Sequence, residues 1–303
     1  MPFEKVSHLD WNTLSDSSPQ AWIFHRAEWI AIEARHFFPE NLSFALEDRH
    51  GLAGIFPFYA TDNSTGTWYE RLLHSGFHRH TGLALSARLS ASDAKAARSA
   101  AMNHIFGLAE RQNADRIQIN AHNLAPENLS IARKEIPFWV EDHAFSLGMA
   151  FGPSGLVAAP GVVTCCADQI VELAADEADL FKHLDDKENV RKAERENVVI
   201  TVGEHFNAVN DFYIVAQKCA SRTGELIMPV DYYNDIWRAF YDHGRCSIIF
   251  ACHNNVPVGA VLLLIYKKSA TYLAGFSDPS SLHLRANDFL LWSAILWAKR
   301  GGL

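Results

Sequence analysis

The sequence predicts an α/β protein of the α+β type, in which mixed, mostly antiparallel sheets are flanked by helices. Helical and strand patterns follow one another in a similar order in the two halves of the chain. The length of 303 residues suits two domains of roughly 100–200 residues each. Apolar residues make up 49% and charged residues 20%, which supplies two ordinary packed cores. We therefore expect an N-terminal domain over residues 1–160 and a C-terminal domain over residues 161–303.

The composition argues against several classes of protein. The formal charge of −8 disfavours DNA and anionic membranes as partners, although a local basic patch can still bind a polyanion. The N-terminal segment lacks the apolar stretch of a signal peptide. The longest apolar run, Val256 to Tyr266, is too short for a membrane span of about 20 residues. We expect a cytoplasmic protein without a transmembrane segment.

The cysteines and histidines favour neither disulfides nor a metal site. The five cysteines are odd in number and form no C-x-x-C pair, and a bridge between the neighbours Cys165 and Cys166 would be strained. His74, His78 and His80 lie close in sequence without a nearby Cys or acidic partner. A loop that lines a pocket explains these histidines better than a metal site does. We predict reduced thiols and no bound metal.

The first half predicts helices and short strands that end in a linker. A helix over Ser90–Arg111 is the clearest, because Ser90 can cap it and alanine is frequent within it. Segment 151–163 is rich in Gly, Pro and small residues and predicts the linker. The other elements expected here are a helix over Trp22–Phe37 and strands over Leu42–Leu46, Gly51–Ala60, Trp68–Leu73, Arg116–Asn120 and His143–Gly148.

The second half predicts helices followed by an antiparallel meander and a last helix. Asn254 and Asn255 suit a tight turn between two of its strands, because asparagine tolerates positive φ. The expected elements are a strand over Gln169–Leu173, helices over Glu177–Asn197, Phe206–Arg222 and Asp231–His243, strands over Cys246–His253, Val256–Tyr266 and Ala270–Phe276, and a helix over Ala286–Lys299.

One predicted helix concentrates positive charge in this acidic chain. Lys187, Arg191 and Arg195 lie four residues apart and so share one side of the helix, and Lys192 lies beside them. Such a row of cations suits a phosphate-bearing ligand. The alternative is a solvated surface helix whose cations pair with neighbouring glutamates.

The sequence around this helix resembles the FemAB family of aminoacyl-tRNA-dependent peptidyltransferases. The similarity extends over about residues 185–302 and depends on the order of several motifs, none decisive alone. These are the helix NVRKAERENV, the segment FYIVAQKCASRTG with Tyr213, Arg222 and Gly224, the group Pro229, Tyr232 and Tyr233, the hairpin with Tyr272 and Gly275, and a final helix that ends in glycine.

This resemblance implies two tandem GNAT-like domains, which have the acyl-CoA N-acyltransferase fold. It further implies transfer of an amino acid from a charged tRNA to an amine of a peptidoglycan precursor. Lys187, Arg191, Lys192, Arg195 and Tyr232 are then the expected substrate-binding residues. The spacer between Arg195 and Phe206 is too short for the helical arm that many family members carry, and the printed sequence stops before the strand with an Asp-x-Gly pattern that usually follows the last helix. Lys187 stands where the family often has Arg.

The expected donor-binding segment lies just before the last helix. In GNAT domains, backbone N–H groups at this position hold a pyrophosphate. Here the residues are His283 to Asp288, without glycine, so coenzyme A binding of the usual kind is disfavoured. We predict donor contacts from Arg285, Ala286 and Asn287, with a plain helix cap as the alternative for Asn287 and Asp288.

The expected chemistry is attack of an amine on an ester or thioester carbonyl, without a cofactor. It needs a group that removes a proton and a group that stabilises the oxyanion. Tyr272, Asp288 and Arg222 are the candidate catalytic residues. The acceptor is a small molecule or peptide, and charged tRNA is a further expected partner. The alternatives are a transferase that uses acyl-CoA or acyl-carrier protein, and a GNAT-fold protein that binds a ligand without turnover.

Overall fold

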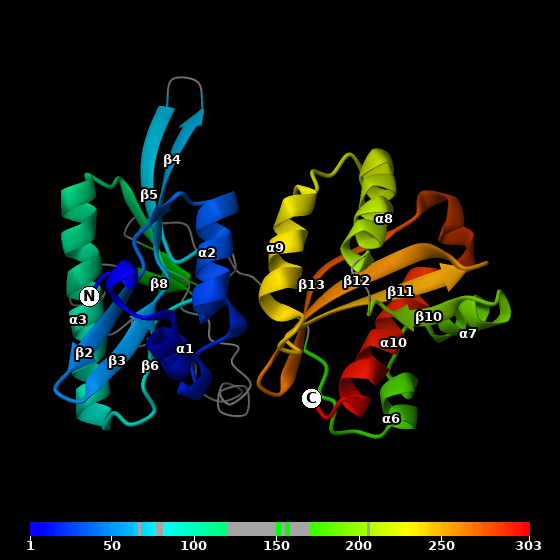
Figure 1. The fold of residues 1–303 in the computed structure, drawn as a ribbon, viewed down its shortest axis with the longest axis horizontal. Helices are drawn as coiled ribbons and strands as arrows, with labels where there is room; N and C mark the ends of the chain where they lie inside the picture. Colours follow the sequence, from blue (N-terminus) through cyan, green and yellow to red (C-terminus); the bar gives the residue numbers. More distant parts are fainter. Residues whose placement is uncertain (66–67, 77–80, 120–149, 153–154, 158–169, 205–206) are drawn as a thin grey trace. The chain divides into compact units, whose positions relative to one another are not determined.

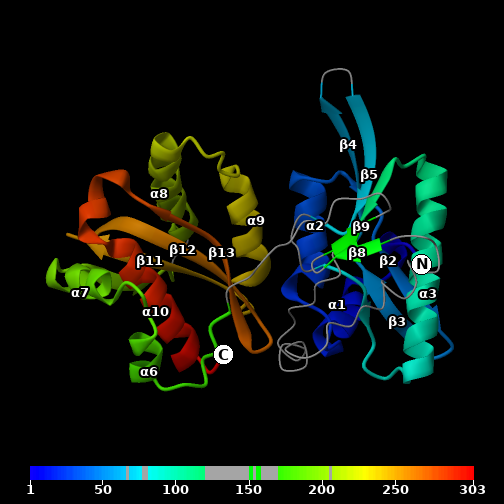
Figure 2. The ribbon, with the colours of Figure 1, turned by 180° about the vertical axis from the view of Figure 1, so that it is seen from behind.

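The computed structural model divides the chain into two compact units, Met1–Asp168 and Gln169–Leu303 (Figures 1 and 2). The structure describes residues 1–65, 68–76, 81–119, 150–152, 155–157, 170–204 and 207–303. Within these residues no helix is long and apolar enough to cross a membrane.

The N-terminal unit contains two small sheets between helices. Strands β1, β4, β5 and β7 form one sheet in that order, and β2, β3 and β6 form the other. All their pairings are antiparallel except the one between β5 and β7. The strands are β1 (Glu40–Asn41), β2 (Phe44–Asp48), β3 (Gly51–Phe56), β4 (Tyr59–Thr65), β5 (Trp68–His74), β6 (Ala84–Leu85) and β7 (Arg116–Gln118), with a separate hairpin of β8 (Ala150–Gly152) and β9 (Gly155–Val157).

Two clusters of buried side chains join these strands to the helices. Helix α3 (Ala91–Gln112) places Ala101, Met102 and Ile105 against side chains from both sheets. Helices α1 (His8–Ser17) and α2 (Ala27–His36) pack in the second cluster, where Trp11 is fully buried. Short 3₁₀ turns η1 (Phe3–Lys5) and η2 (Ile23–His25) precede these two helices.

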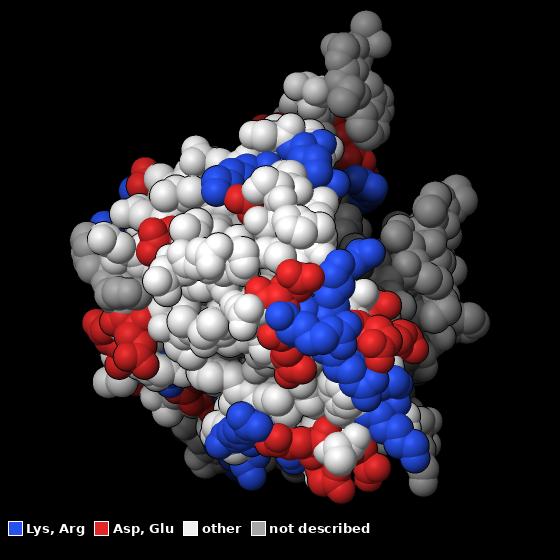
Figure 3. All heavy atoms as spheres, turned by 90° about the vertical axis from the view of Figure 1, so that its right-hand side faces the viewer, with Lys and Arg blue, Asp and Glu red and all other residues white. Residues whose placement is uncertain are grey.

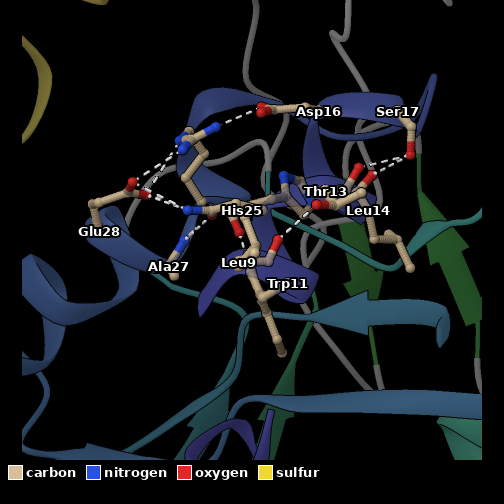
Figure 4. Close-up of polar contacts among 11 residues, drawn as sticks. Leu9, Trp11, Thr13, Leu14, Asp16, Ser17, His25, Ala27 and Glu28 are labelled. Carbon is tan, nitrogen blue, oxygen red and sulfur yellow. Dashed lines mark hydrogen bonds and ion pairs between the residues drawn. The ribbon is translucent and has the colours of Figure 1, made fainter. Parts of the chain in front are cut away.

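A buried arginine connects helices α1 and α2. The guanidinium of Arg26 is 2.5 Å from Asp16 and 3.0 Å from Glu28 (Figure 4). Asn12 completes the network, because it donates to Glu28 and accepts from the amide of Ala27. The charge of Arg26 is therefore compensated, as a buried guanidinium requires.

The C-terminal unit is built on one antiparallel sheet in the order β10, β11, β12, β13. The strands are β10 (Val199–Val202), β11 (Cys246–His253), β12 (Val256–Tyr266) and β13 (Ser269–Ser277). β11 and β12 are almost entirely buried. Asn254 and Asn255 join them with φ of 52° and 61°, which confirms the expected turn.

Helices cover both faces of this sheet (Figures 1 and 2). Helices α8 (Ala208–Thr223) and α9 (Val230–Phe240) lie on one face, where the ring of Phe212 contacts that of Phe276. Helix α10 (Ala286–Arg300) lies on the other face and packs against α7 (Lys187–Arg195) through a core that contains Ala193 and Leu290. Helix α6 (Glu177–Lys182) and the 3₁₀ segment η3 (Pro279–Leu284) complete the unit.

Several predicted elements have different bounds in the structure. The helix expected over Glu177–Asn197 is two helices, because the chain turns at His183–Asp186. The helix expected from Trp22 begins at Ala27, after η2. The strand expected over Gly51–Ala60 is two strands in different sheets, interrupted at Pro57, which has no N–H for a ladder.

Other expectations were wrong in kind or lie outside the described residues. Ile170–Leu173 forms no strand, and instead the carbonyl of Leu173 accepts a hydrogen bond from Lys299. The expected linker contains the hairpin β8–β9. Helix α1 and strand β10 were not predicted. The strand expected at His143–Gly148 lies outside the described residues.

Candidate functional site

A bulge in strand β13 presents Tyr272 beside a glycine. Leu262 and Leu263 of β12 pair with Ala274 and Tyr272, which leaves Leu273 as an extra residue in the ladder. Such a bulge twists the strand and redirects its side chains. A Cβ on Gly275 would overlap the hydroxyl oxygen of Tyr272. The absence of a side chain at Gly275 therefore makes room for the phenol, which is half-exposed.

Tyr272 stays protonated at neutral pH in this environment. Its pKa is raised above the ordinary value of 10.0, first by burial and then by Cys219 of α8. Its partner in the ladder, Leu263, belongs to the core cluster that the sheet shares with α10. A neutral phenol at a strand bulge can donate a hydrogen bond to an oxygen that gains negative charge.

The connection from β13 to α10 is centred on Asp278. Its carboxylate lies 2.7 Å from the Lys218 ammonium and accepts hydrogen bonds from the amide and hydroxyl of Ser280. Its own amide donates to the carbonyl of Val258, and its carbonyl accepts from the amide of Ser281. Burial acts to raise the pKa of Asp278, but Lys218 and Ser280 outweigh it and lower the pKa. This carboxylate is therefore ionised near neutral pH.

The predicted donor residues lie where this connection becomes α10. Arg285 is the N-cap with φ of 58°, and its side chain makes no cap hydrogen bond. Ala286 is buried in the core that α10 shares with α7. Asn287 is exposed, and its amide oxygen lies 3.4 Å from the hydroxyl of Ser277. Asn287 thus joins the end of β13 to the first turn of α10.

Asp288 makes this helix end acidic. Its pKa is raised, first by burial and then by repulsion from Asp186, the residue before α7. Arg285 and a hydrogen bond from Asn189 act in the opposite direction. The first turns of α7 and α10 therefore bring two carboxylates close together. An anion such as a diphosphate is disfavoured here, although a helix N-terminus alone would attract it.

The cations of α7 differ in their surroundings. Lys187 donates to the carbonyls of Lys182 and Leu184 and so caps the C-terminal end of α6. Arg191 pairs with Glu188 and lies 5.6 Å from the ring of Phe181. Among the described side chains, Lys192 and Arg195 have no ion-pair partner. Figure 3 shows the face that carries α7, where a band of Lys and Arg side chains runs between acidic side chains.

Among the described residues, no hydrogen bond or ion pair joins the predicted catalytic residues Tyr272, Arg222 and Asp288. Tyr272 lies on the edge strand β13, and the exposed Arg222 lies near the end of α8. Asp288 lies in the first turn of α10, where Asn189 of α7 is its hydrogen-bond partner. Tyr232, predicted to bind substrate, is only 4% exposed and packs against Tyr233, so its side chain has little surface for a ligand.

The histidine cluster shows no metal site within the described residues. His74 is buried, and its ring nitrogens lie 2.8 Å from the Thr61 hydroxyl and 3.2 Å from the amide of Gly76. Burial lowers the pKa of His74 to about 4, so the ring is neutral. His78 and His80 lie outside the described residues.

The sequence interpretation missed Lys218 and Asp278. The pair Asp278-Pro279 is a local signal, because an acidic cap followed by proline is typical of a helical start. Lys218 has no such signal, since it lies 60 residues earlier in the chain.

Comparisons with known proteins agree with this geometry. Residues 181–303 match the family model described as "Acetyltransferase (GNAT) domain". The crystal structure of FemX has 11% identity and a TM-score of 0.67, with 98% of this chain and 85% of FemX covered. A C-terminal domain of a putative lysylphosphatidylglycerol synthetase from Agrobacterium fabrum has 10% identity and a TM-score of 0.50, with 97% and 74% covered. A comparison with curated protein sequences gave no significant match.

These matches confirm the expected α/β fold, which the chain shares with FemX, and the GNAT-like domain expected in its C-terminal half. The order of strands and helices in the C-terminal unit is the one expected from the sequence resemblance. The domain match supports acyl transfer as the class of activity. Residues 181–303 are therefore similar to the GNAT acetyltransferase domain, within a chain whose fold is similar to that of FemX.

Proposed function

We propose that this protein transfers an activated acyl group, preferably an aminoacyl group on an ester oxygen, to an amine of a small molecule or peptide. The observation that carries the proposal is the bulged strand β13 with its exposed, neutral Tyr272, inside a domain that matches the GNAT model. The FemAB resemblance supports a peptidoglycan precursor as the acceptor.

Tyr272 has a defined place in this reaction. The amine nitrogen forms a bond to the acyl carbon, and the bond from that carbon to the leaving oxygen breaks. The phenol of Tyr272 donates a hydrogen bond to the carbonyl oxygen while negative charge develops on it. The proton released by the amine goes to the departing oxygen. Much of the rate comes from holding the two reactants together.

The first turn of α10 favours an aminoacyl ester over a coenzyme A ester. The connection Asp278–Arg285 contains no glycine, and Asp186 and Asp288 would repel a diphosphate. The residues present therefore do not fit the usual binding of coenzyme A. The name of the lysylphosphatidylglycerol synthetase, whose domain shares the fold, gives further support for an amino acid as the acyl group.

Helix α7 carries the residues that bind the acceptor in this proposal. Lys192 and Arg195 have exposed surface and, within the described residues, no paired carboxylate. They suit the phosphates of a nucleotide-linked acceptor. Lys187 and Arg191 have a smaller share in this binding, because their charges are already engaged.

A thermal-shift panel tests the proposal first, followed by mass spectrometry of acceptor mixtures. The ligands are UDP-N-acetylmuramoyl-pentapeptide, an aminoacyl-tRNA mimic, acetyl-CoA and a long-chain acyl-CoA. A ligand that binds only the folded form raises the unfolding midpoint. We expect a shift with the first two ligands and an acceptor mass increased by one amino acid. Binding without product from any donor would contradict catalysis and support a ligand-binding protein.

A second candidate is an acyl-CoA-dependent N-acyltransferase, because the family model is described as an acetyltransferase domain. A shift with the coenzyme A esters alone, and acylation of an amine by them, would favour this candidate over the aminoacyl donor.

A further inference from the structure

Lys218 and Asp278 form a charge pair at the base of the proposed transfer site. The Asp278 side chain is only 9% exposed, whereas that of Lys218 is 45% exposed. Lys218 belongs to α8, and Asp278 lies directly after β13. The pair therefore connects one face of the sheet to the segment that leads into α10 on the other face.

Asp278 determines the course of this segment through five contacts. One carboxylate oxygen accepts from Lys218 and the other from both donors of Ser280. The amide and the carbonyl of Asp278 bind Val258 and Ser281. Pro279 restricts the next φ angle. These contacts hold the start of the segment, and the buried Leu284 holds its end.

We propose that Lys218 and Asp278 are positioning residues of the transfer site, whose ion pair holds the segment Asp278–Arg285 so that the first turn of α10 meets the acyl donor. The positioning role rests on the proposed function, whereas the holding of the segment does not. Asp278 is nearly buried and its charge needs a partner, so removal of the ammonium leaves an uncompensated carboxylate. The segment then loses its single conformation.

Amide hydrogen exchange of Ser280 to Asp288 tests the holding of the segment without any activity. We compare wild type with Lys218→Met, Lys218→Arg, Asp278→Asn and Asp278→Ala. Asparagine keeps the acceptor for Ser280 but loses the charge, whereas alanine loses both. We expect exchange at least about tenfold faster in Lys218→Met and Asp278→Asn, faster still in Asp278→Ala, and near wild type in Lys218→Arg. Glu177→Gln, which removes the ion pair with Arg300 at the other end of α10, is the matched control and should leave this exchange unchanged.

Transfer kinetics then test the positioning role. We expect kcat to fall at least about tenfold in Lys218→Met with the KM for the acceptor unchanged, and Lys218→Arg to restore it. Exchange that stays at the wild-type rate in Lys218→Met and Asp278→Asn would overturn the inference. Faster exchange with unchanged kcat would overturn the positioning role and leave the proposed function intact. If wild type transfers nothing from any donor, the proposed function fails, and the exchange result still decides whether the pair holds the segment.

Discussion

The hydroxyl group of Tyr272 lies over Gly275, in the space that a Cβ at position 275 would occupy. The bulge at Leu273 lies between the two residues, and the tyrosine side chain extends along its own strand toward Gly275. This relationship gives one side chain a defined position on a strand that is otherwise only partly exposed. It also offers a way to displace Tyr272 without removing it.

Gly275→Ala should displace the phenol and leave the fold intact. Gly275 has no positive φ, so alanine fits the backbone, and the half-exposed ring can swing into solvent. We expect the free energy of unfolding to change by less than about 1 kcal/mol. The transfer rate should fall about tenfold or more, to a value near that of Tyr272→Phe. Equal rates for wild type and both variants would exclude Tyr272 from the reaction.

Asp288→Asn should be more stable than wild type at neutral pH, and this gain in the free energy of unfolding should disappear at acid pH. The folded state raises the pKa of this carboxyl above the ordinary 3.8, so the folded chain holds its proton longer than the unfolded chain does. Stability is therefore lost as the pH rises from the unfolded pKa through the folded pKa. Asparagine carries no charge and avoids this loss. We expect a gain of about a few tenths of a kcal/mol at pH 7, since solvent screens the site, and none at pH 2 in urea unfolding. A gain of the same size at both pH values would contradict this account.

Lys192 and Arg195 should contribute more to acceptor binding than Arg191. Replacement of both by Gln should weaken binding of a UDP-linked acceptor about tenfold at low salt and reduce the salt dependence of binding. Arg191→Gln should have a smaller effect, because Glu188 already pairs with that charge. Arg238→Gln on α9, which is 73% exposed, is the control. Calorimetry at two salt concentrations measures all four proteins, and equal affinities would remove α7 from the site.

The Arg26 network should make the N-terminal unit sensitive to acid. Burial raises the pKa of Glu28, but the hydrogen bonds and charge of Arg26 outweigh it and lower the pKa below 4.5. The stability from this ion pair is present above the unfolded pKa and is lost as the pH falls through the folded pKa. Glu28→Gln should therefore cost stability at pH 7 and little at pH 3. Arg26→Met should cost about 2 kcal/mol or more at pH 7, because it removes the guanidinium that pairs with both Asp16 and Glu28. Chemical unfolding at the two pH values measures both, and a loss for Glu28→Gln that does not depend on pH would argue against the network.

Local signals were sufficient to predict much of the C-terminal unit. The alternation of β11 and β12, the Asn254-Asn255 turn and the helix from Ala286 all depend on residues close in sequence. The family resemblance relied on the same segments, which is why the expected fold was confirmed. The helix over Ser90–Arg111 was equally clear, since Ser90 accepts the amide of Asp93 as a cap.

Contacts that composition and periodicity do not specify decided the rest. The break between α6 and α7 lies in a charged segment with helical composition, and Lys187 stabilises it by binding the carbonyls that end α6. Composition alone predicted one long helix there, because helix propensity does not report which carbonyls find partners outside the helix. Ile170–Leu173 has strand composition but forms no strand, since composition does not specify a partner strand.

The sequence by itself determined strands β11 to β13 and helices α8, α9 and α10 of the C-terminal unit, because period-two patterns, turns and caps act over a few residues. Only the tertiary structure decided which of its polar residues meet. It brought Asn189 and Asp186 to Asp288, and it paired Lys218 with Asp278 across 60 residues. Charge interactions depend on distance in space and on burial, and the packing of α7, α8 and α10 on the two sides of one sheet sets both.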